Sequence, residues 1–352
     1  MGLRANIVAM TGYTPGEQPR ADGYIKLNTN ENPYPPSPRV LEALQRAISA
    51  ERLRKYPDPY GWEVRQAAAH VLGLTPEHIL IGNGSDDILT IVTRAFVPEG
   101  GVVASPWPSY LLYETLAAIQ GAHLVKVPFR PDWDVDPARF PPEVHLTYLA
   151  NPNSPTGTVV RRESVVRLPG FVVIDEAYAD FADGNLLDLV RTSERFLVTR
   201  SLSKSYSLAG IRFGLGIGAP EVIRHLYKVK DSYNCDVLSL IAAREALLDQ
   251  EHMRANCARL RATRTRLIQA LRDLGWHVLD SQANFVWTQP RGPTARAVAE
   301  ALRQRAILVR YMDYPGFGDG LRISIGTDED MDRLIHALRA IVGAVPVGHG
   351  CP

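Results

Sequence analysis

The chain has 352 residues, of which 45% are hydrophobic and 22% charged, a composition typical of globular proteins rather than disordered or fibrous ones. This length suits one large domain with a smaller one. The formal net charge is +1, so the composition gives no reason to expect nucleic acid or an anionic membrane as a partner. Any positive charge that matters for function must therefore be local.

Cysteine usage and the N-terminus favour a cytoplasmic protein. Cys235, Cys257 and Cys351 are widely and irregularly spaced, so we expect neither a disulfide framework nor a metal site. The N-terminal MGLRANIVAM lacks the apolar core and cleavage site of a signal peptide, and no apolar run reaches the length of a membrane span.

The first part of the chain, which includes LNTNENPYPPSP, is too rich in proline for a long helix and predicts an ordered arm over residues 1–35. Short apolar runs then alternate with helical patterns, as in a mostly parallel sheet. Each run is followed by a polar cluster. Because parallel strands end at one edge of a sheet, where ligands bind, we expect these clusters to converge. The runs span residues 78–81, 101–104, 145–150, 171–174 and 195–200.

A different pattern follows two helical stretches near residues 255–275. It predicts a smaller α+β domain over residues 259–352, after a large domain over residues 36–258. The expected strands span residues 283–287, 306–312 and 320–326, and the expected helices span residues 295–305 and 328–342.

The segment GNGSDD, after the first run, is a candidate phosphate site. Gly82 and Gly84 permit a tight turn, and Ser85 is expected to cap a helix whose first backbone N–H groups could bind an anion. An ordinary capped helix is the alternative, since Asp86 and Asp87 themselves favour a first turn.

Two further motifs supply reactive groups. In FVVID, Asp175 follows four apolar residues, so its carboxylate is expected to need a cationic or donor partner, with the Tyr178 phenol nearby. In SLSKSYSLAGIR, hydroxyl groups surround Lys204 and Arg212 follows. The alternatives are a loop-capping aspartate and a solvated serine-rich turn.

Together these groups suit pyridoxal 5'-phosphate, whose aldehyde condenses with a lysine amine, whose ring nitrogen must stay protonated and whose phosphate needs anchoring. On this hypothesis Lys204 takes the aldehyde, Asp175 pairs with the ring nitrogen and Tyr178 donates to the ring hydroxyl. The residues expected to hold the phosphate or stack on the ring are Gly84, Ser85, Tyr110, Ser201, Ser203 and Arg212.

A series of stretches also resembles, in the same order, motifs of the class I/II, fold type I aminotransferases, and among these the histidinol-phosphate aminotransferases most closely. They are LNTNENPYPPSP, KYPDPYGWEVRQAAA, GNGSDDIL, NPNSPTGT, VVIDEAYADF, SLSKSYSLAGIRFG and LRISIGT. The resemblance covers nearly the whole chain. It implies a homodimer with active sites at the subunit interface, an α/β large domain with a mostly parallel central sheet between helices, and a small α+β domain that closes over substrate.

The resemblance further implies pyridoxal 5'-phosphate as cofactor and amino transfer between histidinol phosphate and 2-oxoglutarate or glutamate, a step of histidine biosynthesis. Carried over to this chain, the catalytic residues are Lys204, Asp175 and Tyr178. Tyr56 would reach the phosphate of the other subunit's cofactor. The family's asparagine before PTG is Ser154 here. The cofactor shell is completed by Gly84, Ser85, Asp86, Tyr110, Asn153, Ser154, Ser201, Ser203 and Arg212.

For the substrate, the resemblance points to Arg310 and Arg322 as an anion clamp and to Tyr13 as an arm tyrosine over the imidazole, with Asn30 and Asn284 also at the substrate. Two guanidinium groups would suit a phosphate dianion, each making forked hydrogen bonds. A surface strand residue is the alternative for Arg310.

Other functions remain open at this point. GLGIGA at residues 214–219 has the glycine spacing of a nicotinamide site, although Asp231 and Asp236 follow a helix-like stretch instead of the strand that this fingerprint needs. A threonine-phosphate decarboxylase or an aromatic aminotransferase would use the same Lys204 and Asp175. A non-catalytic binding module would have little reason to keep both.

Overall fold

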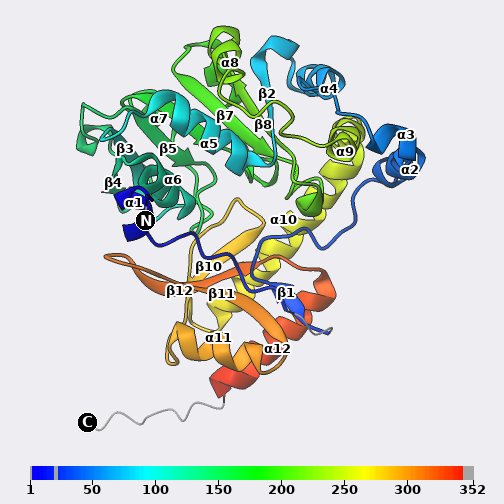
Figure 1. Cartoon of the computed structure of the whole chain (residues 1–352). Coiled ribbons are helices and arrows are strands. Elements are labelled where there is room, and N and C mark those ends of the chain that lie inside the picture. Colours follow the sequence, from blue (N-terminus) through cyan, green and yellow to red (C-terminus); the bar gives the residue numbers. More distant parts are fainter. Residues whose placement is uncertain (1, 20–22, 344–352) are drawn as a thin grey trace.

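The computed structural model describes residues 2–19 and 23–343, and within them two β-sheets lie one above the other (Figure 1). The large sheet is seven-stranded in the order β2-β8-β7-β6-β5-β3-β4, and β8 alone runs antiparallel to its neighbours in this described part. Its strands are β2 (Ile79–Gly82), β3 (Val102–Trp107), β4 (His123–Pro128), β5 (Leu146–Ala150), β6 (Phe171–Asp175), β7 (Phe196–Ser201) and β8 (Gly214–Gly218).

The expected apolar runs form β2, β3, β5, β6 and β7, all pointing the same way. Their carboxyl ends therefore meet at one edge, as predicted. Strand β4 was not expected. It lies at the edge of the sheet with most of its residues partly or fully exposed, so it lacks the continuous apolar run of a buried strand.

Helices cover both faces of the large sheet. One face packs against α5 (Ser85–Phe96), α6 (Leu112–Gln120) and α8 (Pro220–Leu226). The other packs against α2 (Pro38–Ala47), α4 (Trp62–Leu72), α7 (Arg162–Val165) and α9 (Val237–Leu247). The short helix α3 (Ala50–Leu53) connects α2 to α4. Short 3₁₀ helices span Pro76–His78, Pro137–Arg139, Ala179–Phe181, Leu187–Arg191 and Ala209–Ile211. This is the helix–sheet–helix layering expected of an α/β fold.

The small sheet has the order β1-β11-β12-β10-β9, and the helices α10 (Gln250–Asp273), α11 (Ala295–Arg303) and α12 (Asp328–Gly343) pack against it. Its strands are β1 (Ile25–Leu27), β9 (His277–Val278), β10 (Phe285–Gln289), β11 (Ile307–Tyr314) and β12 (Gly318–Ser324). A single helix, α10, replaces the two helical stretches expected near residues 255–275. The expected domain boundary at residues 258/259 falls inside it.

The N-terminal arm contacts the structures around both sheets. Helix α1 (Ala5–Ala9) lies on α6, where the Asn6 side-chain amide donates to the Ala118 carbonyl at 2.7 Å. Further on, β1 joins the small sheet parallel to β11. The arm therefore runs from one sheet to the other. Cys351 lies outside the described residues.

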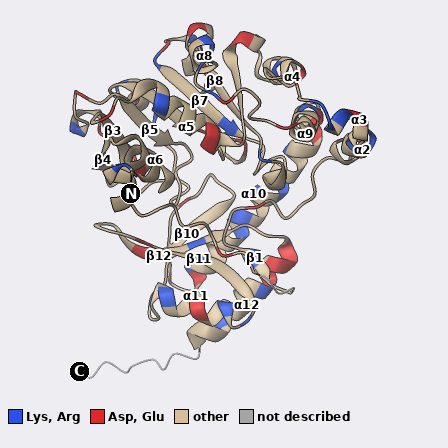
Figure 2. Ribbon diagram, in the orientation of Figure 1, with Lys and Arg blue, Asp and Glu red and all other residues tan. Residues whose placement is uncertain are grey.

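Basic and acidic residues are interspersed on the helices around both sheets (Figure 2). Among the described residues, none of the helices is both long enough and apolar enough to span a bilayer.

Close packing explains the first glycine of GLGIGA. A Cβ atom at Gly214 would lie 2.5 Å from both the Gly84 carbonyl carbon and the Ser85 nitrogen, so glycine lets β8 pass directly against the start of α5. The stretch is a strand instead of a strand-to-helix loop, and Asp236 caps α9 instead of ending a strand. A nicotinamide fingerprint is therefore not formed.

Candidate functional site

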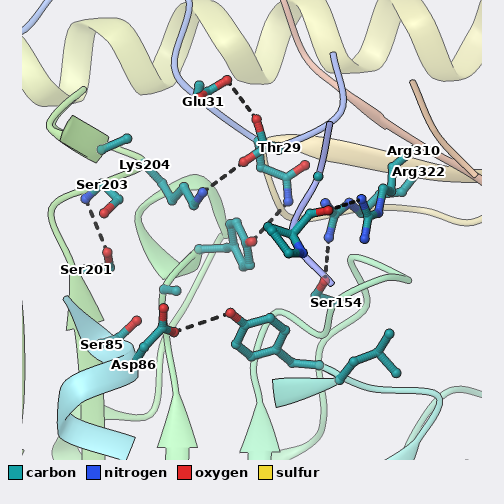
Figure 3. Close-up of a pocket in the computed structure, with 18 of the residues that line it drawn as sticks. Thr29, Glu31, Ser85, Asp86, Ser154, Ser201, Ser203, Lys204, Arg310 and Arg322 are labelled. Atoms are coloured by element: carbon teal, nitrogen blue, oxygen red, sulfur yellow. Dashed lines mark hydrogen bonds between the residues drawn. The ribbon is translucent and has the colours of Figure 1, made fainter. Parts of the chain in front are cut away.

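A cavity of about 310 Å³ lies where the carboxyl ends of the large-sheet strands face the arm and the small sheet (Figure 3). It brings together most of the residues expected at the site. Those that line it are Tyr13, Asn30, Ser85, Asp86, Tyr110, Ser154, Asp175, Tyr178, Ser201, Ser203, Lys204, Arg212, Arg310 and Arg322.

Lys204 lies in the turn after β7, and its side chain points into the cavity (Figure 3). Its amine donates to the Thr29 carbonyl at 3.0 Å. Burial, followed by the positive charge of Arg322, lowers the pKa of this amine to about 8. A substantial fraction of Lys204 is therefore neutral, and able to act as a nucleophile, near pH 8.

Asp175 ends β6, is buried and lines the cavity. It accepts hydrogen bonds from the Tyr113 hydroxyl at 3.0 Å, the Thr199 hydroxyl at 2.9 Å and the Ala177 amide at 3.3 Å. Burial raises the pKa of the carboxyl, while the hydrogen bonds from Thr199 and Tyr113 oppose the change. None of its partners within the described residues is a cation, so the site is suited to a positively charged ligand group.

Tyr178 lies three residues after the end of β6, and its hydroxyl accepts a hydrogen bond from the Asn30 side-chain amide at 3.0 Å. Burial raises the pKa of this phenol, although the charge of Arg322 acts in the opposite direction. The hydroxyl therefore keeps its proton at neutral pH and can donate it to an acceptor in the cavity.

The anion-binding features lie together at one end of the cavity, where Ser85 and Asp86 begin α5 and Ser201 ends β7 (Figure 3). Arg212 lies 3.4 Å from both the Ser203 hydroxyl and the Asp86 carboxylate. Helix N–H groups, hydroxyls and a guanidinium form a set suited to phosphate. The predicted cap at Ser85 is wrong, because Gly84 is the N-cap, with φ 82°, and no side-chain cap bond forms. The helix start therefore keeps its N–H groups free of a serine cap.

Aromatic residues cover one side of the cavity. The Tyr110 hydroxyl lies 3.3 Å from Asp86, and Tyr13 of the arm packs edge-on against the Tyr110 ring with 5.9 Å between ring centres. The two rings place the arm against the large sheet at the cavity. They offer an apolar face to a planar ligand.

The opposite end of the cavity holds two arginines from the small sheet (Figure 3). Arg310 of β11 and Arg322 of β12 are direct cross-strand partners, so both side chains lie on the same face of the sheet. Arg322 donates to the Ser154 hydroxyl and to the Asn28 carbonyl, each at 3.1 Å. Arg310 donates to the arm carbonyls of Thr14 at 2.9 Å and Pro15 at 3.0 Å.

Some expected residues do not line the cavity. Asn153 is buried and donates to the Pro108 carbonyl and the Thr156 hydroxyl, while Asn284 donates to the Asn30 carbonyl at 2.9 Å. Gly84 lies just behind Ser85. Tyr56 is 80% exposed and stacks on Tyr233. In this chain, Asn153 and Asn284 therefore hold neighbouring backbone in place.

Sequence reasoning missed several residues that shape the site. Thr29 and Glu31 line the cavity beside Lys204, and Tyr113 and Thr199 hold Asp175. Thr199 carried a signal, since it is a polar residue within an apolar run and is paired with Asp175 across β6 and β7. Tyr113 carried none, because its contact depends on how α6 packs on the sheet.

The chain is similar to known aminotransferases in sequence and in structure. The family model "Aminotransferase class I and II" matches residues 22–338. A histidinol-phosphate aminotransferase of Rhodopirellula baltica is 50% identical over 94% of this chain and 93% of its own, and one of Geotalea uraniireducens is 46% identical over 96% and 99%. The crystal structure of histidinol-phosphate aminotransferase from Sinorhizobium meliloti in complex with pyridoxal-5'-phosphate superimposes with a TM-score of 0.88, at 28% identity over 97% of this chain and 98% of that one. The chain therefore belongs to the class I and II aminotransferase family.

Proposed function

We propose that this protein is a pyridoxal-phosphate-dependent aminotransferase that exchanges an amino group between histidinol phosphate and 2-oxoglutarate in histidine biosynthesis. The observation that carries the choice of substrate is the pair Arg310 and Arg322, which face one cavity from directly opposite positions on two strands. Like charges directly opposite one another destabilise a sheet, and a dianionic phosphate between them removes that cost.

The residues of the cavity fit the cofactor. Asp175 is a buried carboxylate without a cationic partner in the described part of the chain, and a protonated ring nitrogen supplies that partner. Ser85, Ser201, Ser203 and Arg212 surround the place for its phosphate. When bound, pyridoxal 5'-phosphate supplies an aldehyde and a ring that withdraws electrons from the substrate.

The chain's own residues then position groups and move protons. Lys204, partly neutral near pH 8, would supply the nucleophilic amine, and it would take and return the proton at the amine-bearing carbon of the substrate. Asp175 would keep a ring nitrogen beside it charged. Tyr178 would donate to the ring oxygen, and Tyr110 would cover the ring face. Arg322 and Arg310 bind the anionic end of each substrate, a phosphate in one half-reaction and a carboxylate in the other.

A half-reaction screen tests the proposal. The protein loaded with pyridoxal phosphate is mixed in turn with histidinol phosphate, phenylalanine, aspartate and threonine phosphate. Conversion of the cofactor to pyridoxamine phosphate is followed by absorbance. We expect the largest second-order rate constant for histidinol phosphate. Preference for phenylalanine would instead identify an aromatic aminotransferase, and loss of carbon dioxide from threonine phosphate would identify a decarboxylase.

The quaternary structure and location belong to the same proposal. The molecule would be a homodimer in which Tyr56 reaches the partner's cofactor phosphate. Its exposure supports this, as does the exposure of Leu53, Tyr60 and Trp62 in the same part of the chain. A cytoplasmic location is supported by Cys235 and Cys257, which are buried free thiols. The chain would divide into an arm over residues 1–35, a large domain over residues 36–258 and a small domain over residues 259–352, with the second boundary inside α10.

A further inference from the structure

A chain of hydrogen bonds, two of them buried, runs from the small sheet to the Tyr178 hydroxyl. The Asn30 backbone N–H donates to the Ser324 hydroxyl at 2.8 Å, and that hydroxyl donates to the Asn30 side-chain carbonyl oxygen at 3.0 Å. The Asn30 side-chain amide then donates to the Tyr178 hydroxyl at 3.0 Å. Asn30 and Ser324 are each 1% exposed, so water does not compete for the two bonds between them, whereas the bond to Tyr178 lies at the wall of the cavity.

The direction of every bond in this chain follows from its first member. A backbone N–H can only donate, so the Ser324 oxygen accepts there and its own proton is free to go to the Asn30 carbonyl oxygen. That contact fixes which end of the Asn30 amide faces Tyr178, namely the N–H₂ end. The Tyr178 oxygen thus accepts on one side, and its proton points elsewhere. The cavity that Tyr178 lines is the direction left for this proton.

We propose that Asn30 and Ser324 are positioning residues that hold Tyr178 as a hydrogen-bond donor toward the cavity. This inference rests on the proposed function, in which an anionic oxygen of the bound cofactor accepts from Tyr178. It assigns Asn30 a role through Tyr178 instead of contact with the substrate. The left-handed backbone of Asn30, with φ 58°, is one that asparagine tolerates better than most residues.

The same bonds connect three separate parts of the molecule. Ser324 ends β12 of the small sheet, Asn30 belongs to the arm after β1, and Tyr178 follows β6 of the large sheet. The side-chain amide of Asn284, just before β10, donates to the Asn30 carbonyl, and the Asn284 backbone carbonyl accepts from the Ile325 amide. The donor direction of Tyr178 therefore depends on the small sheet and the arm being in place against the large sheet.

The test is a double-mutant cycle read by spectroscopy of the holoenzyme. The pH midpoint of the absorbance change of bound pyridoxal phosphate is measured, together with the Kd for pyridoxal phosphate. Tyr178→Phe removes the donated proton and should raise the midpoint by about one pH unit. Asn30→Asp keeps the shape but replaces the donor by an acceptor, so Tyr178 turns its proton toward residue 30, and the midpoint should rise by a comparable amount.

The cycle separates this effect from the added charge of the aspartate. In the Tyr178→Phe background, Asn30→Asp should add well under half the shift that it causes in the wild-type background, because only the charge effect remains. Ser324→Ala adds no charge and should raise the midpoint only when Tyr178 is present. Thr327→Ala, which removes the hydroxyl that accepts from the Asp330 amide at the start of α12, should leave it unchanged.

Equal shifts with and without the Tyr178 hydroxyl, for either Asn30→Asp or Ser324→Ala, would overturn the inference. If Asn30→Asp does not fold, as judged by circular dichroism, the Ser324→Ala cycle decides alone. A wild-type protein that takes up no pyridoxal phosphate and transfers no amino group refutes the proposed function. A wild-type protein that does both but shows no coupling refutes only the roles of Asn30 and Ser324.

Discussion

At the scale of single residues, burial shifts the pKa values of Lys204 and Asp175 in opposite directions. It lowers the pKa of the amine to about 8 and raises the pKa of the carboxyl, so it disfavours the charged form of each. Nucleophilic attack needs a neutral amine, whereas pairing with a cationic ring nitrogen needs a charged carboxylate. The hydrogen bonds from Tyr113 and Thr199 favour that charged form before any ligand binds.

Replacing Lys204 by alanine should retain the fold and reduce turnover about 10⁴-fold, because both the nucleophile and the group that moves the α-proton are lost. Turnover under saturating substrate measures this, with circular dichroism as the check on folding. Near-normal activity would contradict the role of Lys204.

The same variant reveals the lowered pKa without any cofactor. Between about pH 8 and pH 10.5, the unfolded chain keeps the Lys204 proton while the folded chain loses it, so the folded state gains stability as pH rises. Wild-type apoprotein should therefore gain up to about 3 kcal/mol relative to Lys204→Ala across this window. Urea unfolding at several pH values measures the difference. Parallel stability curves would contradict the lowered pKa.

Asp175→Asn should reduce turnover about 10²- to 10³-fold while some cofactor stays bound, because the amide cannot keep the ring nitrogen charged. Asp280→Asn is the matched control, since that carboxylate is 88% exposed and forms only a surface ion pair with Arg272. Steady-state kinetics and cofactor titration measure both variants. An Asp175→Asn enzyme as fast as the Asp280→Asn enzyme would remove Asp175 from the mechanism.

How much could be predicted at this scale depends on whether a contact is local. Lys204, Asp175 and Arg212 stand in motifs whose order along the chain was enough to predict the family, and that prediction is confirmed. Their roles stay predictions. Asn30 was expected at the substrate and lines the cavity, but its hydrogen bonds with Tyr178 and Ser324 depend on tertiary packing that no local pattern encodes.

At the scale of elements, the contact between β8 and the start of α5 leaves no room for a side chain at Gly214. Gly214→Ala would push its Cβ to 2.5 Å from backbone atoms of Gly84 and Ser85, so the start of α5 must shift. We expect a loss of about 1–3 kcal/mol in stability and weaker binding of the cofactor phosphate. Gly210→Ala is the control, since no atom lies within 4 Å of its added Cβ. Thermal melts and cofactor titration of both variants provide the comparison, and equal behaviour would count against the close approach.

The pairing of β11 with β12 places Arg310 opposite Arg322, and it predicts a selective defect. Arg310→Ala should raise KM for histidinol phosphate about 10- to 100-fold, because a forked contact to the phosphate is lost. The KM for a substrate analogue without the phosphate should change far less. Arg305→Ala, at an exposed position just before β11, controls for the loss of positive charge. An equal rise in KM for the analogue without the phosphate would argue against a phosphate clamp.

Elements with a strong burial signal were predictable, and those defined by their neighbours were not. Strands β5 and β6 are buried along their whole length and appear in the sequence as unbroken apolar runs. Strand β4 is an exposed edge, and β8 is rich in glycine because of its packing against α5, so neither carried that signal.

At the scale of the whole molecule, the exposed aromatic residues near the start of α4 predict self-association. Tyr56 stacks on Tyr233 with ring centres 4.4 Å apart, while its side chain remains 80% exposed. Sedimentation equilibrium should give about twice the chain mass of 38.9 kDa. Tyr56→Phe should weaken cofactor binding about 10-fold without dissociating the dimer, because only one hydroxyl contact to phosphate is lost. A monomeric protein that still binds the cofactor would contradict the proposed interface.

Helix α10 has a mechanical consequence for the molecule. Its 24 residues form an unbroken rod, which begins at the Asp249 cap beside α9 and ends against the small sheet. At a rise of 1.5 Å per residue this rod is about 36 Å long, so a tilt of about 10° at one end displaces the other by about 6 Å. A small tilt at the start of α10 would thus move its far end by a distance similar to the size of a substrate's phosphate group.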